Sequence, residues 1–433
     1  MQRLTRKIVG VLAITVAVLP SFGQEQKVEL NLNKVLELGK ANNLTIKLYQ
    51  AQQVLATADL TKAREWWLPD LNVGARTHWL KGSAMNGNGV FFTDVDRNNL
   101  WIGAGLDASW DFGNEVFKTK SARLLSQASK FRTEQAQNDV LLSSIESYFD
   151  LLLADVQIAS YGQLIEQSDA IITQLKAQVD GGLRYQSELL LAKSSRSLLK
   201  MKQVNSVAER TILAAQLIEL LVLNSESEIE VTEKILAPIE LIAQSSEGLS
   251  SAEVYEKMPL LKMYDLRNDA IIAKRKEQTW GMLLPTIQFQ VYGSLFGGYS
   301  SALRPTGETN AAVGWNIPLS LISGGDLKRS KSLETISDLS KQAEQQKIAS
   351  NLYRAKNRLS QLKERMGLAS EAQEFASQAL EQSTAREDLG TAQPFEVYEA
   401  QQVYMEARME YLSSIADYNK EQYRLYVALG NVL

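Results

Sequence analysis

The sequence predicts a mainly α-helical chain with a membrane β-barrel, built from a duplicated helix–strand–strand–helix unit. Three observations predict this fold class. Long stretches without proline carry apolar residues at heptad spacing, which is typical of packed long helices. Shorter stretches alternate apolar and polar residues with a period of two, which is typical of strands. Both kinds of stretch occur twice in the same order, which indicates an internal repeat.

The chain begins with the pattern of a secretory signal peptide. Basic residues precede an apolar run from 8 to 19, and the small residues Ser21 and Gly23 suit cleavage before Gln24. We therefore expect residues 1–23 to be removed from an exported protein. A short membrane anchor is the alternative, but the run is shorter than the roughly 20 apolar residues that a spanning helix needs.

Composition excludes several classes of protein. The chain has no cysteine, one histidine and a formal net charge of −4. The absence of cysteine excludes disulfides, thiolate metal sites and lipid attachment at an N-terminal cysteine. The charge gives no basic footprint for nucleic acid. Because no phosphate loop or nucleophile motif is present either, we expect no enzyme, no catalytic or metal-binding residue and no cofactor.

Corresponding landmarks define the two copies of the repeat. The first copy is predicted over 24–223 and the second over 249–433, and the Ser- and Glu-rich stretch 224–248 is predicted to link them. The shared landmarks are a proline after each short helix, a glycine after the strands and a glycine after each long helix: Pro69 and Pro285, Gly113 and Gly324, and Gly182 and Gly390.

Each copy contains two predicted strands. Within 100–112, the apolar residues fall on one side and small or polar residues on the other, and the same alternation follows Pro285 and recurs at 313–321. Strands of about ten residues with one apolar face and tryptophans near their ends are typical of outer-membrane barrels. The Gly-, Asn- and Ser-rich stretches 81–99 and 297–310 are expected to be exposed loops.

Strand number then predicts an oligomer. The smallest outer-membrane barrels have about eight strands. Each repeat supplies two strands, so one chain has four and cannot close a barrel alone. Unpaired strand edges are not tolerated in lipid, so the missing strands must come from other copies of the chain. A soluble sandwich is the alternative, but strands separated by such long helices cannot build a sandwich core. His78 falls on the polar face, where a solvated pore residue is expected.

The helices form the larger part of the chain. No proline occurs from Asn114 to Val179, which predicts a helix on the order of 100 Å long at about 1.5 Å per residue. Its heptad stripe changes phase after Gly162, which indicates a stutter. Small and polar residues within the stripe suggest neighbours on two sides. An ordinary coiled-coil stalk would account for the heptads but not for the strands.

Taken together, the chain from about 28 to 433 resembles the TolC-like outer-membrane efflux protein family. The resemblance rests on the two helix–Pro–strand transitions, the strand-to-helix segments WDFGNEV and SLISGGDLKRS, the GL and GT turns at 182–183 and 390–391, and the ending YRLYVALG. It implies a trimer that shares one 12-stranded β-barrel in the outer membrane and extends a long α-helical coiled-coil barrel into the periplasm.

The resemblance also implies a function. Members of the family are passive exit ducts for small molecules or polypeptides, and they dock on a periplasmic adaptor (membrane fusion) protein and an inner-membrane pump or secretion ATPase. Two alternatives come from other classes: a periplasmic coiled-coil scaffold or adaptor without a pore, and an enzyme of the envelope. Dependence on detergent separates the first alternative from a channel, and the lack of a convergent catalytic set argues against the second.

Candidate site residues follow from the resemblance. Glu396 and Glu399 correspond to acidic residues of the periplasmic constriction, although glutamate is also common on solvated helix faces. The adaptor-docking turns correspond to Gly182, Leu183, Gly390 and Thr391, with Glu188 near the first turn. Family members carry an arginine two residues after the second turn glycine, whereas this chain has Ala392, and Pro394 begins the returning helix.

Overall fold

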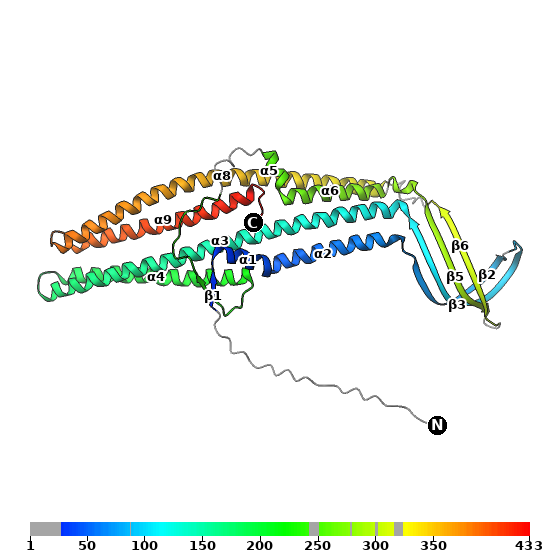
Figure 1. The fold of residues 1–433 in the computed structure, drawn as a ribbon, viewed down its shortest axis with the longest axis horizontal. Coiled ribbons are helices and arrows are strands. Elements are labelled where there is room, and N and C mark those ends of the chain that lie inside the picture. Colours follow the sequence, from blue (N-terminus) through cyan, green and yellow to red (C-terminus); the bar gives the residue numbers. More distant parts are fainter. Residues whose placement is uncertain (1–26, 87, 242–250, 278, 299–301, 316–323) are drawn as a thin grey trace, which may run out of the picture.

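The protein is a long helical rod with a β-sheet at one end (Figure 1). Its structure is a computed structural model that describes residues 27–86, 88–241, 251–277, 279–298, 302–315 and 324–433. The predicted signal peptide, residues 1–23, lies outside the described residues, as do the last residues of the predicted linker and of the strand predicted at 313–321.

Helices of the first repeat follow the predicted order. The helices are α1 (Leu32–Asn42), α2 (Leu44–Arg64), α3 (Phe112–Asp180) and α4 (Gln186–Leu221). The 69 residues of α3 include the predicted range Asn114–Val179 and reach about 100 Å at 1.5 Å per residue. As Figure 1 shows, α2 lies along the half of α3 next to the sheet, and α4 lies along the half that ends at the tip.

The second repeat has the same arrangement. Its helices are α5 (Ser251–Lys257), α6 (Pro259–Glu277), α8 (Gly325–Asp388) and α9 (Pro394–Ala428). Here α6 and α9 lie along the two halves of α8, while α3 contacts α6 near the sheet and α9 near the tip. The order across the rod is therefore α2–α3–α6–α8 in one half and α4–α3–α9–α8 in the other. As a result, α2 and α4 form one lateral side, and α8 forms the opposite side.

The sheet contains β2 (Asp70–Met85), β3 (Phe91–Asp111), β5 (Thr286–Gly298) and β6 (Arg304–Gly314), which pair antiparallel in the order β2–β3–β5–β6. Strands β2 and β6 are its edges. The register confirms the two predicted faces, because Leu106 lies between Leu71 and Val291 and the next row places Gly105 between Asn72 and Tyr292. The first row belongs to the apolar face and the second to the polar face.

Both predicted loops are shorter than expected. Strand β2 continues to Met85 and β3 begins at Phe91, so most of 81–99 is paired strand. In the second hairpin β6 already begins at Arg304. The β-branched and aromatic residues of the Val90–Phe92 segment favour extended backbone, and the Asn86 side chain accepts hydrogen bonds from the Asn88 and Val90 amides, which closes the first hairpin tightly. Composition alone did not show this.

In the first repeat, the change from helix to strand takes place at two tryptophans and a proline, Trp66, Trp67 and Pro69. Helix α2 is followed by a 3-10 turn at Glu65–Trp67, and β2 begins after Pro69. The Trp110 indole donates to the carbonyl of Trp67 over 2.8 Å, and Trp66 packs edge-on against Phe112. Proline fits these positions because it cannot continue the helix and its φ suits an extended start.

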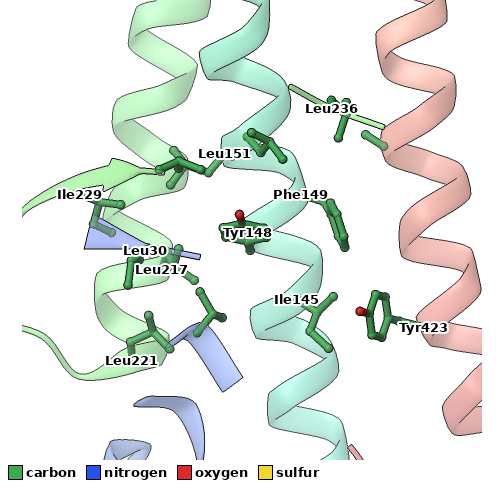
Figure 2. Packing of buried hydrophobic residues seen from close by; sticks show 14 of the residues in the cluster. Leu30, Ile145, Tyr148, Phe149, Leu151, Leu217, Leu221, Ile229, Leu236 and Tyr423 are labelled. Carbon is green, nitrogen blue, oxygen red and sulfur yellow. The ribbon is translucent and has the colours of Figure 1, made fainter. Parts of the chain in front are cut away.

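A small sheet and a core lie at the middle of the rod. Strand β1 (Lys27–Leu30) pairs parallel with β4 (Glu228–Val231). Together with α3, α4 and α9 they bury a cluster around Tyr148, which has no exposed surface (Figure 2). The stretch 224–248 is therefore more than a linker, since its Ile229, Val231 and Leu236 are buried in this core. Its Ser- and Glu-rich composition concealed a short alternating strand.

Candidate functional site: the helical tip, the lateral sides and the sheet

The two turns at the helical tip have the same backbone structure. Gly182 and Gly390 have φ values of +73° and +72°. After α3 the Gly182 amide donates to the Val179 carbonyl and the Leu183 amide to that of Gln178. After α8 the amides of Gly390 and Thr391 donate in the same way to Glu387 and Arg386. This double hydrogen bond around a left-handed glycine is the Schellman motif, which satisfies the last carbonyls of a helix.

Apolar side chains are exposed around these turns. Leu183 and Leu389 are each 79% exposed, and Tyr185 and Phe395 are also exposed. In many Schellman motifs the residue at the Leu183 position packs against the last turn of its own helix, but here Leu183 faces solvent. Leu183 was predicted from the sequence as part of a docking turn, whereas Tyr185, Leu389 and Phe395 were not predicted. An apolar residue within a few positions of each turn glycine was the signal that could have identified them.

Glu396 stabilises the start of α9. Its backbone amide donates to the side chain of Gln393, and its carboxylate accepts from the Gln393 amide over 3.4 Å, which forms a capping box. The same carboxylate lies 3.1 Å from a guanidinium nitrogen of Arg386 at the end of α8. Helix α9 begins at Pro394, as expected of a proline in the first turn. Glu396 therefore connects the two helices of the second hairpin.

Glu399 has different surroundings, although it lies only one turn further along α9. The residue is exposed, and no basic side chain in the described part of the chain lies within 4.0 Å of its carboxylate. The sequence grouped Glu396 and Glu399 as equivalent carboxylates. In the structure Glu396 has structural partners, and Glu399 is available to solvent or to a ligand.

The two hairpin tips are joined by polar contacts. Arg184 donates to the carbonyl of Ala392 over 3.4 Å and lies 3.9 Å from Glu188. Further from the tip, the buried side chains of Ser168 on α3 and Gln401 on α9 are 3.0 Å apart, and Gln401 also donates to a backbone carbonyl of α3. Residue 392 is alanine, and its backbone carbonyl is reached by an arginine of the other hairpin.

Tyr398 is buried between the two hairpins. Its ring packs against Leu175, Leu189 and Ala192 of the first hairpin, and its hydroxyl has no hydrogen-bond partner among the described residues. Burial raises the pKa of Tyr398 well above its usual range, and the nearby carboxylates of Glu387 and Glu188 add to this effect. The phenol therefore stays neutral at physiological pH.

Exposed apolar residues cover both lateral sides of the rod. On one side they follow the length of α4, and on the opposite side they follow α8. Spacings of three and seven residues occur in both sets and are typical of a helix face that packs against another helix. The residues on α4 are Leu190, Leu191, Leu198, Met201, Val204, Val207 and Ile212, and those on α8 are Leu333, Ile336, Leu339, Tyr353, Leu368 and Phe375.

The two faces of the sheet differ in chemistry. Large apolar side chains of the apolar face are exposed, among them Leu71, Val73 and Trp79 on β2. His78 pairs with Asn99 on the polar face, as predicted. None of the helices that the structure describes is both long and apolar enough to cross a membrane. The described residues also contain no group of three or more acidic or histidine side chains arranged to hold a metal ion.

Comparisons with known proteins give one family match over part of the chain and several solved structures with a similar fold. Residues 35–221 match the family described as outer membrane efflux protein. No curated protein matches the chain. Among solved structures, the fold is similar to the CmeC outer membrane channel of Campylobacter jejuni (TM-score 0.75, 15% identity, covering 99% of this chain and 94% of that one). It is also similar to the outer membrane protein VceC of Vibrio cholerae (TM-score 0.74, 14% identity, covering 93% and 96%).

Proposed function

We propose that this chain, whose residues 35–221 belong to the outer membrane efflux protein family, is one subunit of a trimeric outer-membrane channel. The channel is a passive exit duct for small molecules or polypeptides. The chain itself performs no covalent chemistry, so the energy for transport comes from an inner-membrane partner.

The observation that carries this proposal is the pair of unlike open sides on each subunit. One side presents the free edge of β2 together with the apolar stripe of α4, and the other presents the free edge of β6 together with the stripe of α8. Two different surfaces that complement each other form a head-to-tail contact, and head-to-tail contacts close into rings. A strand edge in lipid needs a partner, so β6 of one copy pairs with β2 of the next.

Three copies agree with the number of strands. Each subunit contributes the strands β2, β3, β5 and β6, so three subunits contribute 3 × 4 = 12, an even number within the range of about 8 to 26 that bacterial outer-membrane barrels have. The helices then form a coiled-coil barrel that continues into the periplasm. The count of three rests on the family resemblance, whereas ring closure rests on the two open sides.

The apolar face of the sheet fits the outside of such a barrel. Trp79 lies at one end of this face, opposite Asn98, and Trp110 lies twelve residues further along β3, since 110 − 98 = 12. At about 3.3 Å per residue and a tilt of about 40°, the two tryptophan rows are about 30 Å apart along the barrel axis. Aromatic girdles flank the lipid-facing band of outer-membrane barrels at a similar spacing. The polar face then lines the lumen.

The tip supplies the contacts for periplasmic partners. The Schellman turns at Gly182-Leu183 and Gly390-Thr391 present exposed leucine and aromatic side chains, which suit docking of an adaptor protein that links the channel to an inner-membrane pump or secretion ATPase. Glu399 and, behind it, Glu396 line the periplasmic constriction in this proposal. Rings of carboxylates on a threefold axis favour cations.

The proposal is tested by purifying the mature protein in detergent, measuring its mass by light scattering and recording conductance in planar bilayers. A trimer that conducts ions supports it. A folded monomer that is soluble without detergent and has no conductance would overturn it in favour of a periplasmic scaffold or adaptor.

A further inference from the structure

Charged side chains on the polar face of the sheet are separated by sign. The register orders this face into rows, and one row of small residues, which runs from Gly74 through Gly103 and Ser294 to Thr306, divides it. The carboxylates of Asp70, Asp107, Asp111 and Glu308 all lie on the side next to the helices. The guanidinium groups of Arg76, Arg97 and Arg304 all lie on the side away from the helices.

The row next to the small residues combines charge with aromatic rings. Arg76 pairs with Trp101, Trp101 with Phe296, and Phe296 with Arg304. Directly opposite residues on neighbouring strands have Cβ atoms about 5 Å apart, so these four side chains form one continuous row, here called the arginine–aromatic row. Arg76, Phe296 and Arg304 are exposed and Trp101 is half-buried. A solute moving along this face can therefore reach all of them.

Three of the four carboxylates near the helices accept side-chain hydrogen bonds, whereas Arg76 and Arg304 have no carboxylate partner among the described residues. Asp107 accepts hydrogen bonds from Asn72 and from the Tyr292 hydroxyl. In contrast, no carboxylate in the described residues lies within 4.0 Å of the guanidinium group of Arg76 or Arg304. Charge-assisted bonds from a guanidinium to an oxyanion are among the stronger polar contacts, and here this capacity is unused. The row thus has free cationic donors beside aromatic rings.

We propose that the arginine–aromatic row is a binding belt for organic anions that carry an aromatic ring. The anionic group is held by Arg76 or Arg304, and the ring stacks on Trp101 and Phe296. This inference rests on the proposed function, since it is in the closed barrel that this face lines a lumen. Both arginines lie on the edge strands β2 and β6, so each boundary between copies brings one strand of each kind together and doubles the local positive charge.

The chemistry favours this class of ligand over two others. A small anion without a ring, such as methanesulfonate, uses the arginines but gains nothing from the aromatic side chains. An aromatic cation, such as benzyltrimethylammonium, stacks on the rings but is repelled by the two guanidinium groups. Because arginine also stacks on flat π-systems, a ligand with both features uses the whole row.

Isothermal titration calorimetry on the detergent-solubilised oligomer tests the belt, with naphthalene-2-sulfonate as the probe and the other two compounds as matched ligands. We expect naphthalene-2-sulfonate to bind at least about tenfold more tightly than either. The double substitution Arg76→Gln with Arg304→Gln, and separately Trp101→Leu, should each weaken its binding about tenfold. The control Lys81→Gln, whose side chain lies on the opposite face beside Trp79, should leave it unchanged.

Each outcome separates the belt from the proposed channel. If the oligomer forms and conducts but binds the three compounds equally, the belt is wrong and the channel stands. If Lys81→Gln weakens binding as much as the arginine variants do, the probe binds by general attraction to positive charge, and the belt is again wrong. The pair Arg76→Lys with Arg304→Lys keeps the charge but not the planar group, and retention of only part of the affinity supports stacking. If no ring of subunits forms, the channel itself is wrong.

Discussion

The two repeats build the same turns with different contacts. Where the first repeat passes from strand to helix, the backbone of Gly113 lies directly against that of Gly281, which begins the 3-10 turn Gly281–Leu283 between α6 and β5. The corresponding Gly324 has a left-handed backbone with φ +63°, and no atom of a described residue beyond its chain neighbours lies within 4 Å of where its Cβ would be. Both positions need glycine, but for different reasons: close backbone approach in the first repeat and backbone conformation in the second.

The tips differ in a similar way. Both use a left-handed glycine in the same motif, but the second tip adds a capping box and the ion pair between Arg386 and Glu396. In the first tip, α4 begins after Tyr185 with no side-chain cap, and Arg184 is 3.9 Å from Glu188. The two tips therefore share a backbone structure but differ in their side-chain contacts. The comparison indicates a more firmly held second tip and a first tip whose helix start is less stabilised.

The largest expected effect comes from Gly113→Ala. A Cβ at this position would lie 1.9 Å from the carbonyl oxygen of Gly281, so the two backbones must separate. We expect a loss of about 3 kcal/mol of stability or more, which the thermal midpoint of the solubilised protein should report. Gly324→Ala is the matched variant, and strain of about 1 to 2 kcal/mol is expected there. Equal shifts for the two variants would contradict the distinction between the repeats.

The second-largest loss of stability is expected where the segment that connects the two repeats packs against α9. Asn419 on α9 is fully buried, and its side chain accepts from the amide of Ile239 over 2.8 Å and donates to the carbonyl of Ala237 over 2.9 Å. Asn419→Ala leaves both backbone groups unpaired, so a loss of about 2 to 3 kcal/mol is expected. Asn357→Ala, at an exposed position of α8, should change the thermal midpoint little. A thermal midpoint for Asn419→Ala as high as that of the control would mean that water replaces the amide.

A smaller loss of stability is expected at the two tip glycines, and it should be equal for the two. Gly182→Ala and Gly390→Ala each force alanine into a left-handed conformation, which costs about 1 to 2 kcal/mol. Hydrogen exchange should become faster in the last turns of α3 and α8. Gly181→Ala is the control, because Gly181 has φ −83°, a value that alanine adopts readily. Unequal effects of the two tip variants would show that the shared motif does not determine tip stability.

The smallest effect separates the two glutamates of the second tip. Glu396→Gln weakens the ion pair with Arg386, and a loss of about 0.5 to 1 kcal/mol is expected. Glu399→Gln should leave stability unchanged, since surface substitutions usually fall within about 0.5 kcal/mol. It should instead reduce cation selectivity and block by trivalent cations in planar bilayers. If Glu399→Gln changes neither selectivity nor block, the constriction lies elsewhere.

Sequence reasoning reached the features that depend on local pattern. Period-two alternation gave the two faces of β3 and β5, and the absence of proline gave the long helix α3. Both tip turns were also predicted from the sequence, since glycine after a long helical pattern indicates a helix end. At the tip it treated Glu396 and Glu399 alike, because spacing does not reveal that Arg386 lies opposite only one of them.

Features that depend on distant contacts were missed. Strands β1 and β4 contain four residues each and pair Lys27 with Glu228, some two hundred residues away. So short an alternation is not distinguishable from a polar linker until its partner is known. The extended first hairpin was missed for another reason, because glycine and asparagine near its end suggested a loop although Val90, Phe91 and Phe92 favour a strand.

Disulfide cross-linking between the open edges tests the proposed ring most directly, and the native chain contains no cysteine that would interfere. Thr309→Cys on β6 is combined, one at a time, with cysteine at positions 71, 73, 75, 77 and 79 of β2, all on the apolar face. The account predicts that at least one pair yields a covalent trimer under oxidation and that the single-cysteine variants stay monomeric on denaturing gels. Covalent dimers without trimers, or no cross-link for any pair, would contradict it.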